Sequence, residues 1–236
     1  MKTTKLATVV AALVVSMAAV LPTRAATYTQ SHGFSGIPNY FTPLTFSKFN
    51  VPGATLNSIK VTCNLNISGG QLIVDNDGAG PATVTVGLGA YGNLSSTDVT
   101  LKDASNHAIP PQVNCSTGST FNLGADNGDG PLNVDPNPPD GATHNGGPAS
   151  NSKSGFVGSA YFSHYIGSGT YNVNAEVSQL LYFGGIAGIE GTFTPVWSGG
   201  SVEVIYDYGP VPEPSGVLAL AGGLGCLVPV LRRRRP

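Results

Sequence analysis

The stretch Ser58–Ser68, SIKVTCNLNIS, decides the fold class of this chain. Its odd-numbered positions from 59 to 67 carry Ile, Val, Cys, Leu and Ile, and the positions between them are polar. A period of two is the spacing of a β-strand that buries one of its faces. The stretch therefore predicts a half-buried central strand with Lys60 and Asn64 facing outward.

The same alternation recurs on both sides of this strand, at Val84–Leu88 and at Val202–Tyr208. Weaker strand patterns cover 27–34, 40–49, 72–75, 99–101, 156–162, 170–177 and 191–196. Charged residues make up only 10% of the 236 residues, which excludes a coiled coil or a helical bundle, whereas 32 Gly and 18 Pro supply turns. We expect an all-β fold, an antiparallel β-sandwich formed by one domain over residues 26–210.

Residues 103–154 depart from the strand pattern. Pro, Gly, Asn and Asp crowd this stretch, most densely in Asp126–Pro131 and Asp135–Gly141. Loops of this length are uncommon in compact domains and are usually functional or mobile. We therefore expect a long Pro/Gly/Asp-rich surface excursion from the sandwich.

The first 25 residues have the pattern of a secretory signal peptide. Lys2 and Lys5 precede the uncharged, mostly apolar run Leu6–Leu21. The small residues Thr23 and Ala25 stand three residues and one residue before a cleavage site that follows Ala25. We predict a signal helix over 1–25 that is cleaved after Ala25. The alternative is an uncleaved anchor, but sixteen residues is short for a span that needs about twenty.

The last 26 residues, 211–236, have three parts. A short polar motif is followed by the uncharged run Gly216–Leu231, predicted as a transmembrane helix, and then by four arginines. The motif residues are Val211, Pro212, Glu213, Pro214 and Ser215, and the basic residues are Arg232, Arg233, Arg234 and Arg235. Basic residues beside a span stay cytoplasmic, so they act as a stop-transfer signal and the body between the two ends is expected outside.

This tail closely resembles the PEP-CTERM sorting signal of Gram-negative bacteria, in content, order and position. The resemblance implies recognition by exosortase, a membrane transpeptidase-like enzyme, with cleavage near Pro212–Pro214. It also implies export by the secretion machinery and a transient stay in the inner membrane. The mature protein would then lie at the periplasmic face, on the cell surface or in the extracellular matrix, in association with exopolysaccharide and biofilm.

The body resembles the choice-of-anchor E domains that often accompany this tail. The matching segments are Phe34–Gly36, Leu44–Phe49, Leu56–Val61, Tyr165–Thr170 and Gly199–Tyr208. The family carries no established enzymatic activity, so the resemblance implies no catalytic residues.

The charge of the body excludes a nucleic-acid or phosphate binder. Between positions 26 and 210 four lysines stand against twelve carboxylates, a net charge of −8, and arginine is absent. The carboxylate-rich patches comprise Asp75, Asp77, Asp126, Asp129, Asp135 and Asp140. They lack the closing Glu of a looped calcium motif, and Asp-Gly pairs make turns without metal, so we predict no metal site and no cofactor.

Cys63 and Cys115 are the two cysteines of the body. Export makes a disulfide between them chemically feasible. Cys63 lies on the apolar face of its predicted strand, so a buried free thiol is the competing interpretation.

Three functions remain. The leading hypothesis is a non-catalytic surface or matrix protein, because no catalytic motif is visible. The alternatives are a secreted carbohydrate-binding module and a polysaccharide-acting enzyme with two facing carboxylates. Aromatic residues that could stack on sugars, or fill the core, are Tyr161, Phe162, Tyr165, Tyr171, Tyr182 and Phe183.

Overall fold

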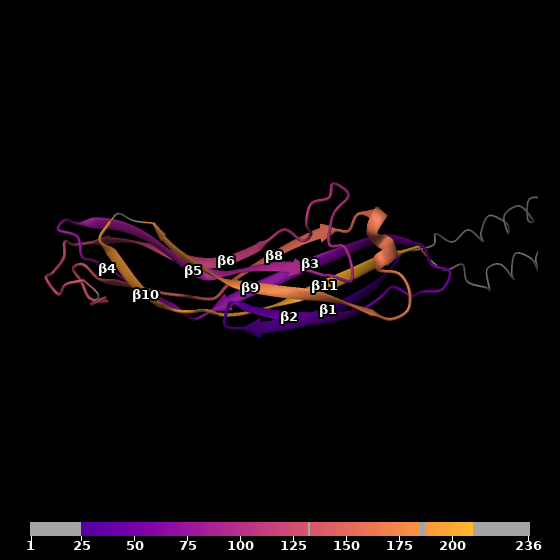
Figure 1. Cartoon of the computed structure of the whole chain (residues 1–236), viewed down its shortest axis with the longest axis horizontal. Coiled ribbons are helices and arrows are strands. Elements are labelled where there is room, and N and C mark those ends of the chain that lie inside the picture. Colours follow the sequence, from indigo (N-terminus) through magenta and orange to yellow (C-terminus); the bar gives the residue numbers. More distant parts are fainter. Residues whose placement is uncertain (1–24, 132, 185–186, 210–236) are drawn as a thin grey trace, which may run out of the picture. The chain divides into compact units, whose positions relative to one another are not determined.

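The computed structural model describes residues 25–131, 133–184 and 187–209 (Figure 1). This part of the chain is all-β, as predicted, and its sheets are mostly antiparallel. None of its helices is long and apolar enough to cross a bilayer. The predicted signal helix and the predicted transmembrane helix at Gly216–Leu231 lie outside the described residues.

Eleven strands and one short 3-10 helix succeed one another within the described ranges. They are β1 (Ala26–Gly36), β2 (Tyr40–Ser47), β3 (Leu56–Ser68), β4 (Gln71–Asn76), β5 (Ala82–Ser95), β6 (Val113–Leu123), β7 (Ala142–Asn145), β8 (Ala149–Phe156), η1 (Ser159–His164), β9 (Thr170–Gly184), β10 (Ile189–Thr194) and β11 (Trp197–Tyr208).

The chain divides into two compact units. The described residues of the smaller unit are 25–27, 51–57 and 207–209, where the Gly209 amide donates to the Thr55 carbonyl at 2.7 Å. The larger unit comprises 28–50 and 58–206. The three sheets have strand orders β1-β11-β3-β8, β2-β9-β5-β6 and β10-β4-β7, and all their residues belong to the larger unit except the last two at one end of β1, β3 and β11.

The alternation that decided the fold class is confirmed in β3. Its five apolar side chains from 59 to 67 are each 2% exposed or less, and the positions between them are partly or fully exposed. In β5, Val84, Val86 and Leu88 are buried while Thr83 and Thr85 are exposed. A strand that buries one face has its register fixed by this pattern, because a slip of one residue would turn every apolar side chain outward.

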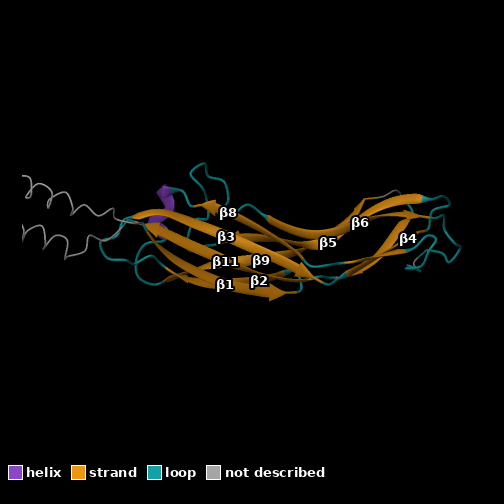
Figure 2. Ribbon diagram, turned by 180° about the vertical axis from the view of Figure 1, so that it is seen from behind, coloured by secondary structure: helices purple, strands orange, loops and turns teal. Residues whose placement is uncertain are grey.

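The two four-stranded sheets contact each other through aromatic side chains. Tyr171 on β9 and Tyr206 on β11 are both buried, and their hydroxyls are 2.7 Å apart. Tyr206 also stacks on Phe49 with ring centroids 5.6 Å apart. Figure 2 shows the strands of these two sheets running side by side through the larger unit.

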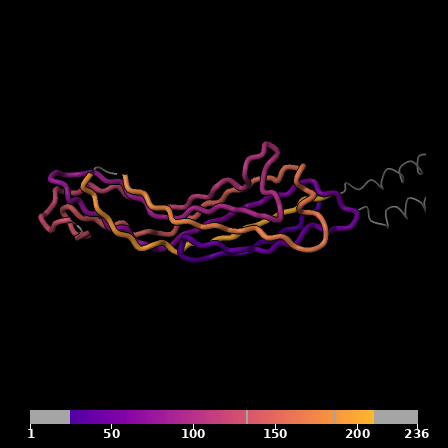
Figure 3. Tube along the Cα trace, viewed as in Figure 1, coloured from indigo at the N-terminus to yellow at the C-terminus, as the bar shows by residue number. Residues whose placement is uncertain are grey.

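The three-stranded sheet packs on the first residues of β5 and the last residues of β6. Buried side chains from three strands make its core: Leu72, Val74, Val84, Val86 and Leu123. Figure 3 shows β4 and β10, more than 100 residues apart in sequence, running side by side at the end of the larger unit opposite η1.

The predicted excursion at 103–154 is wrong. The stretch contains β6, β7 and most of β8, and β6 pairs with β5 over its whole length. Two weaker strand predictions are also wrong: 99–101 forms no strand, and 156–162 contains the end of β8 and the start of η1. The β6 and β8 strands escaped prediction because most of their side chains are Ser, Thr, Asn and Gly, which leave little apolar periodicity.

Candidate functional site

Five aspartates from separate segments meet at one end of the three-stranded sheet, and we call them the acidic cluster. Asp75 lies in β4 and Asp77 follows that strand. Asp126 and Asp129 lie in the loop after β6, and Asp140 precedes β7. The antiparallel pairing of β4 with β7 brings these segments to the same end of the sheet.

Backbone hydrogen bonds join the three segments. The Asn76 amide donates to the Asp140 carbonyl at 3.2 Å, and the Asp126 amide donates to the Gly78 carbonyl at 3.0 Å. The Asn76 side chain is 1% exposed and donates to the carbonyls of Gly80 and Gly124. The loop that carries the aspartates is therefore held by the sheet rather than extended into solvent.

The acidic cluster contains two overlapping triads. Carboxylate oxygens of Asp75, Asp77 and Asp129 lie within 4.8 Å of one another, and so do those of Asp126, Asp129 and Asp140. Asp129 belongs to both triads.

Two carboxylates of the cluster are buried, and their donors among the described residues are neutral. Asp75 is 1% exposed and accepts from the backbone amides of Asn76 and Asp135, both at 2.9 Å. Asp140 is fully buried and accepts from the Asn127 amide at 2.6 Å and from the Asn127 side chain at 3.1 Å. Among the described residues no lysine or arginine side chain donates to any member of the cluster.

Asp129 has one oxygen with a partner and one without. Its Oδ2 accepts from the Asn133 side chain at 3.1 Å. Its Oδ1 is shielded from solvent and has no hydrogen-bond partner among the residues that the structure describes. The residue as a whole is only partly buried, so water can still reach other atoms of its side chain.

The charges of the cluster act on one another. Loss of hydration raises the pKa of Asp77, and the nearby charges of Glu190 and the other aspartates raise it further. The pKa of Asp129 is raised for the same reasons, with Asp75 and Asp140 as the strongest charged neighbours. Negative charge is thus concentrated here beyond what the site itself neutralises.

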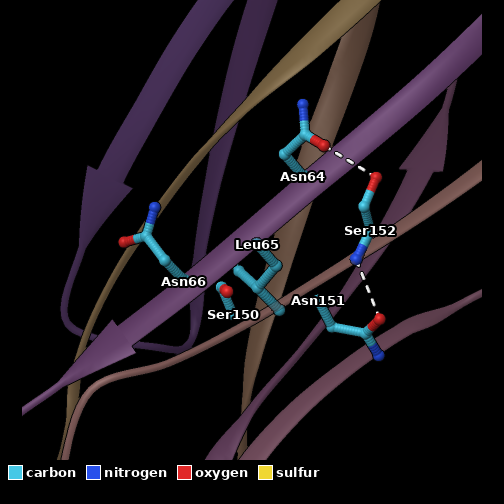
Figure 4. A pocket seen from close by; sticks show the side chains of 6 residues that line it. All are labelled: Asn64, Leu65, Asn66, Ser150, Asn151 and Ser152. Atoms are coloured by element: carbon cyan, nitrogen blue, oxygen red, sulfur yellow. Dashed lines mark hydrogen bonds between the residues drawn. The ribbon is translucent and has the colours of Figure 1, made fainter.

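A neutral groove lies between the neighbouring strands β3 and β8 (Figure 4). It is lined by Asn64, Leu65, Asn66, Ser150, Asn151 and Ser152. The Ser152 hydroxyl donates to the Asn64 side chain at 2.7 Å, and Asn64 in turn donates to the Ser201 hydroxyl at 3.1 Å. Such amides and hydroxyls can exchange hydrogen bonds with a hydroxyl-rich ligand, but carry no charge.

The aromatic residues singled out in the sequence do not form one surface. Tyr165 and Tyr171 are core residues, at 0% and 1% exposed. Tyr182 and Phe183 on β9 are 54% and 40% exposed. Neither of the two interpretations, core or sugar stacking, holds for the whole set.

A buried histidine was not anticipated from the sequence. His144 on β7 is 6% exposed, and its two ring nitrogens lie 3.1 Å from the Thr117 hydroxyl and 2.9 Å from the Ser119 hydroxyl. Hydroxyls occupy both nitrogens, so no carboxylate orients this imidazole as a Ser-His-Asp triad requires. The arrangement connects β6 to β7 and is structural.

Both body cysteines are free and buried. The Cys115 thiol faces the backbone of Ile67, which lies four residues, about 13 Å, along β3 from Cys63. The two thiols are thus offset from each other along β3, and they form no disulfide in the structure. Burial raises the pKa of the Cys63 thiol to about 11.

The predicted processing residues are mostly outside the described part. Ala25 is exposed and directly precedes β1. The motif Val211–Ser215 and the arginines Arg232–Arg235 lie beyond residue 209, the last one described.

Comparison with protein-family models gave no match, and comparison with curated proteins gave none. Among solved structures, the chain is similar to a chain of the infectious bursal disease virus Gt strain at a TM-score of 0.16 and 12% identity, covering 81% of this chain and 43% of that one. For the Gx strain the TM-score is 0.15 and the identity 14%, with coverage of 89% and 48%. The chain spans less than half the length of these viral chains, and similarity this weak carries no argument about fold or function.

Proposed function

We propose that this protein is an exported, non-catalytic cell-surface or extracellular-matrix protein that an exosortase sorts through its C-terminal signal. The observation that carries the proposal is the sequence of the tail, in which three parts follow one another: Val211–Ser215, then the uncharged run Gly216–Leu231, then Arg232–Arg235. Each part has its own physical role. The run holds the chain in the bilayer, the arginines stop transfer, and the prolines keep the motif extended for a protease.

The architecture of the body supports a passive role. The strands occupy Ala26 to Tyr208, which is the segment between the two proposed signals. The facing sheets favour a β-sandwich body, flanked in the precursor by a signal helix and a transmembrane helix. In the described residues the most buried carboxylates, Asp75 and Asp140, are held by backbone and amide donors, an arrangement that suits structure rather than proton transfer.

A carbohydrate-binding module is the second candidate. The observation that favours it is the neutral Asn/Ser groove between β3 and β8, whose side chains match sugar hydroxyls. A glycan array with the full-length protein and with Asn66→Ala tests this candidate. Binding to a defined glycan that Asn66→Ala abolishes would establish it, and an array without signal would exclude it.

Mass spectrometry of the C-terminal peptide from the native host tests the sorting proposal. We expect a new C-terminus near Pro212–Pro214 and loss of the four arginines. Replacement of Arg232–Arg235 by Ser should leave the tail uncut and leave the fold of the body unchanged. Recovery of mature protein that still ends in Pro236 would show that the tail is a permanent anchor and refute processing.

A further inference from the structure

We propose that the free edge of β9, at residues 178–184, pairs with the same edge of a second copy of this chain. The two strands would run antiparallel about a two-fold axis at Leu181. The proposal does not depend on the sorting signal or on the neutral groove. It rests on an unpaired strand edge, an opening of the core beside that edge, and the neutrality of both.

The edge exists because β2 is shorter than β9. In its sheet β9 lies between β2 and β5. Residues 170–177 pair with β2, whereas residues 174–184 pair with β5. In the part of the chain that the structure describes, no strand pairs with the β2 side of residues 178–184. An edge of this kind is a template for a further strand.

The backbone groups at the edge are set by the last contacts with β2. The Val177 carbonyl accepts from the Asn39 amide at 2.7 Å, and the Gln179 amide donates to the Asn39 side chain at 3.1 Å. Alternate residues of a strand direct their amides and carbonyls to the same side, so those of Leu181 and Phe183 face the free edge.

A second copy satisfies these groups. With the axis at Leu181, this residue faces its own copy and exchanges two hydrogen bonds with it. Each Phe183 amide donates to the Gln179 carbonyl of the other copy, so about four backbone hydrogen bonds form in all. The Gln179 amide needs no new partner, because it is already bonded to Asn39.

The core is open beside this edge. Leu181 is the register partner of Leu88, and Phe183 is the register partner of Val86. Cross-strand partners share one face of a sheet, which here is the buried face, since Leu88 is 0% and Val86 1% exposed. Leu181 and Phe183 are nevertheless 37% and 40% exposed. Two side chains that point to the core are therefore left uncovered.

The strand β10 borders the same opening. Its Phe193 is the register partner of Leu72, which is fully buried, yet Phe193 is 42% exposed. The Phe183 ring lies over Gly191 of β10, where a Cβ would come within 2.6 Å of a ring carbon. Leu181, Phe183 and Phe193 thus form one uncovered apolar strip, which we call the open edge.

Two further apolar side chains lie near the start of the open edge. Ile37 is 57% and Trp197 54% exposed, and their sequence neighbours Gly36 and Ser198 are joined by a hydrogen bond of 2.9 Å. The exposed parts of all five side chains amount to on the order of 400–500 Å², at about 150–250 Å² for a large side chain. Each partner of a stable complex buries about 800 Å², so these side chains and the paired backbone together approach what a dimer needs.

Charge selects a second copy as the occupant. Residues 177–184 carry no charged side chain, whereas residues 26–210 have a net charge of −8. Two bodies of like charge repel each other least where they meet through neutral surfaces. Proteins protect sheet edges with Pro and Lys, as Pro43 does on β2 and Lys153 on β8, but the open edge has neither.

Sedimentation velocity of the full-length protein in a non-ionic detergent, from about 1 to 100 µM, tests the proposal. We expect a monomer–dimer equilibrium with a dissociation constant on the order of 1–10 µM, the weak end for interfaces of this size. Leu181→Lys sets two like charges against each other at the axis and should weaken dimerisation at least tenfold. Phe41→Lys changes a side chain that is 56% exposed on β2 and should dimerise as the wild type does. Circular dichroism confirms that both variants are folded.

A disulfide crosslink tests the register without adding charge. Hydrogen-bonded partners in antiparallel strands have Cα atoms about 5.5 Å apart, which a disulfide can span. Leu181→Cys, in a Cys226→Ser background, should therefore form a covalent dimer on treatment with oxidised glutathione. Glu176→Cys is the matched control, because position 176 is exposed on the same strand but lies beside β2. It should stay monomeric in the same treatment.

Three results would overturn the proposal. The first is a monomer up to about 100 µM, tenfold above the expected dissociation constant, which would leave the open edge to a strand of another protein. The second is wild-type dimerisation of folded Leu181→Lys, which would place the association elsewhere in the chain. The third is a Leu181→Cys crosslink that is absent, or no stronger than that of Glu176→Cys.

Discussion

The two buried tyrosine hydroxyls that join the facing sheets should contribute unequally to stability. The Tyr206 hydroxyl donates to the Ser47 carbonyl at 3.3 Å, since a carbonyl can only accept. The Tyr171 hydroxyl, 2.7 Å away, must then donate its proton to Tyr206. Tyr206 thus accepts a hydrogen bond from Tyr171 and donates one to Ser47.

Replacing either tyrosine by Phe therefore removes different hydrogen bonds. Tyr171→Phe deletes one hydrogen bond and leaves Tyr206 still donating to Ser47, a cost of about 1 kcal/mol. Tyr206→Phe leaves the Tyr171 hydroxyl as a buried donor without an acceptor, a cost of about 2–3 kcal/mol. The double variant leaves no tyrosine hydroxyl unpaired, so it should cost less than the sum of the single variants.

Urea unfolding of the full-length protein and its three variants measures these free energies, provided the m-values agree. We expect Tyr206→Phe to be less stable than Tyr171→Phe by at least about 1 kcal/mol. Equal costs, or a larger cost for Tyr171→Phe, would refute the assigned direction of the hydrogen bond.

Three further predictions concern the core, strand contact and alkaline stability. Leu88→Ala should cost about 2–5 kcal/mol in urea unfolding, because Leu88 is 0% exposed. Its register partner Leu181 is 37% exposed, so Leu181→Ala should cost well under half as much. Gly89→Ala would bring a Cβ to 2.2 Å from a β6 carbonyl and should cost at least about 1–3 kcal/mol, while Gly87→Ala, with 3.5 Å to the nearest atom, should be tolerated; equal thermal midpoints would contradict this. Burial raises the pKa of Tyr206 to about 12, above its unfolded value near 10, so its contribution is complete below pH 10 and falls by about 1.4 kcal/mol per pH unit from pH 10 to 12. The difference in 295 nm absorbance between the wild type and Tyr206→Phe should accordingly show its ionisation shifted upward or coupled to unfolding, and a difference centred near pH 10 without unfolding would contradict the burial.

The strands that the sequence predicted well are those that bury one continuous face. In β3 the alternation is complete because every second side chain enters the core. In β6 the inward side is mixed: Val113 and Cys115 are buried, but Thr117 and Ser119 bond to a histidine instead of packing against apolar groups. Polar pairing of this kind removes the hydrophobic period on which prediction depends.

The acidic cluster illustrates a different limit. Its aspartates are all visible in the sequence, but they come from three segments, so no contiguous motif groups them. Asp75 and Asp140 are 65 positions apart, and only the pairing of β4 with β7 brings them together. Burial of Asp140 has no sequence signal, since its neighbours are Pro and Gly.

The position of β11 inside its sheet has a mechanical consequence. The strand is hydrogen-bonded to β1 on one side and to β3 on the other. Tension on the chain beyond Tyr208 would pull β11 along its own axis, so the bonds of both ladders would share the force and have to break together. An edge strand, by contrast, can be peeled away one bond at a time. An interior strand in this position is therefore suited to withstand a pulling force applied at its C-terminal end.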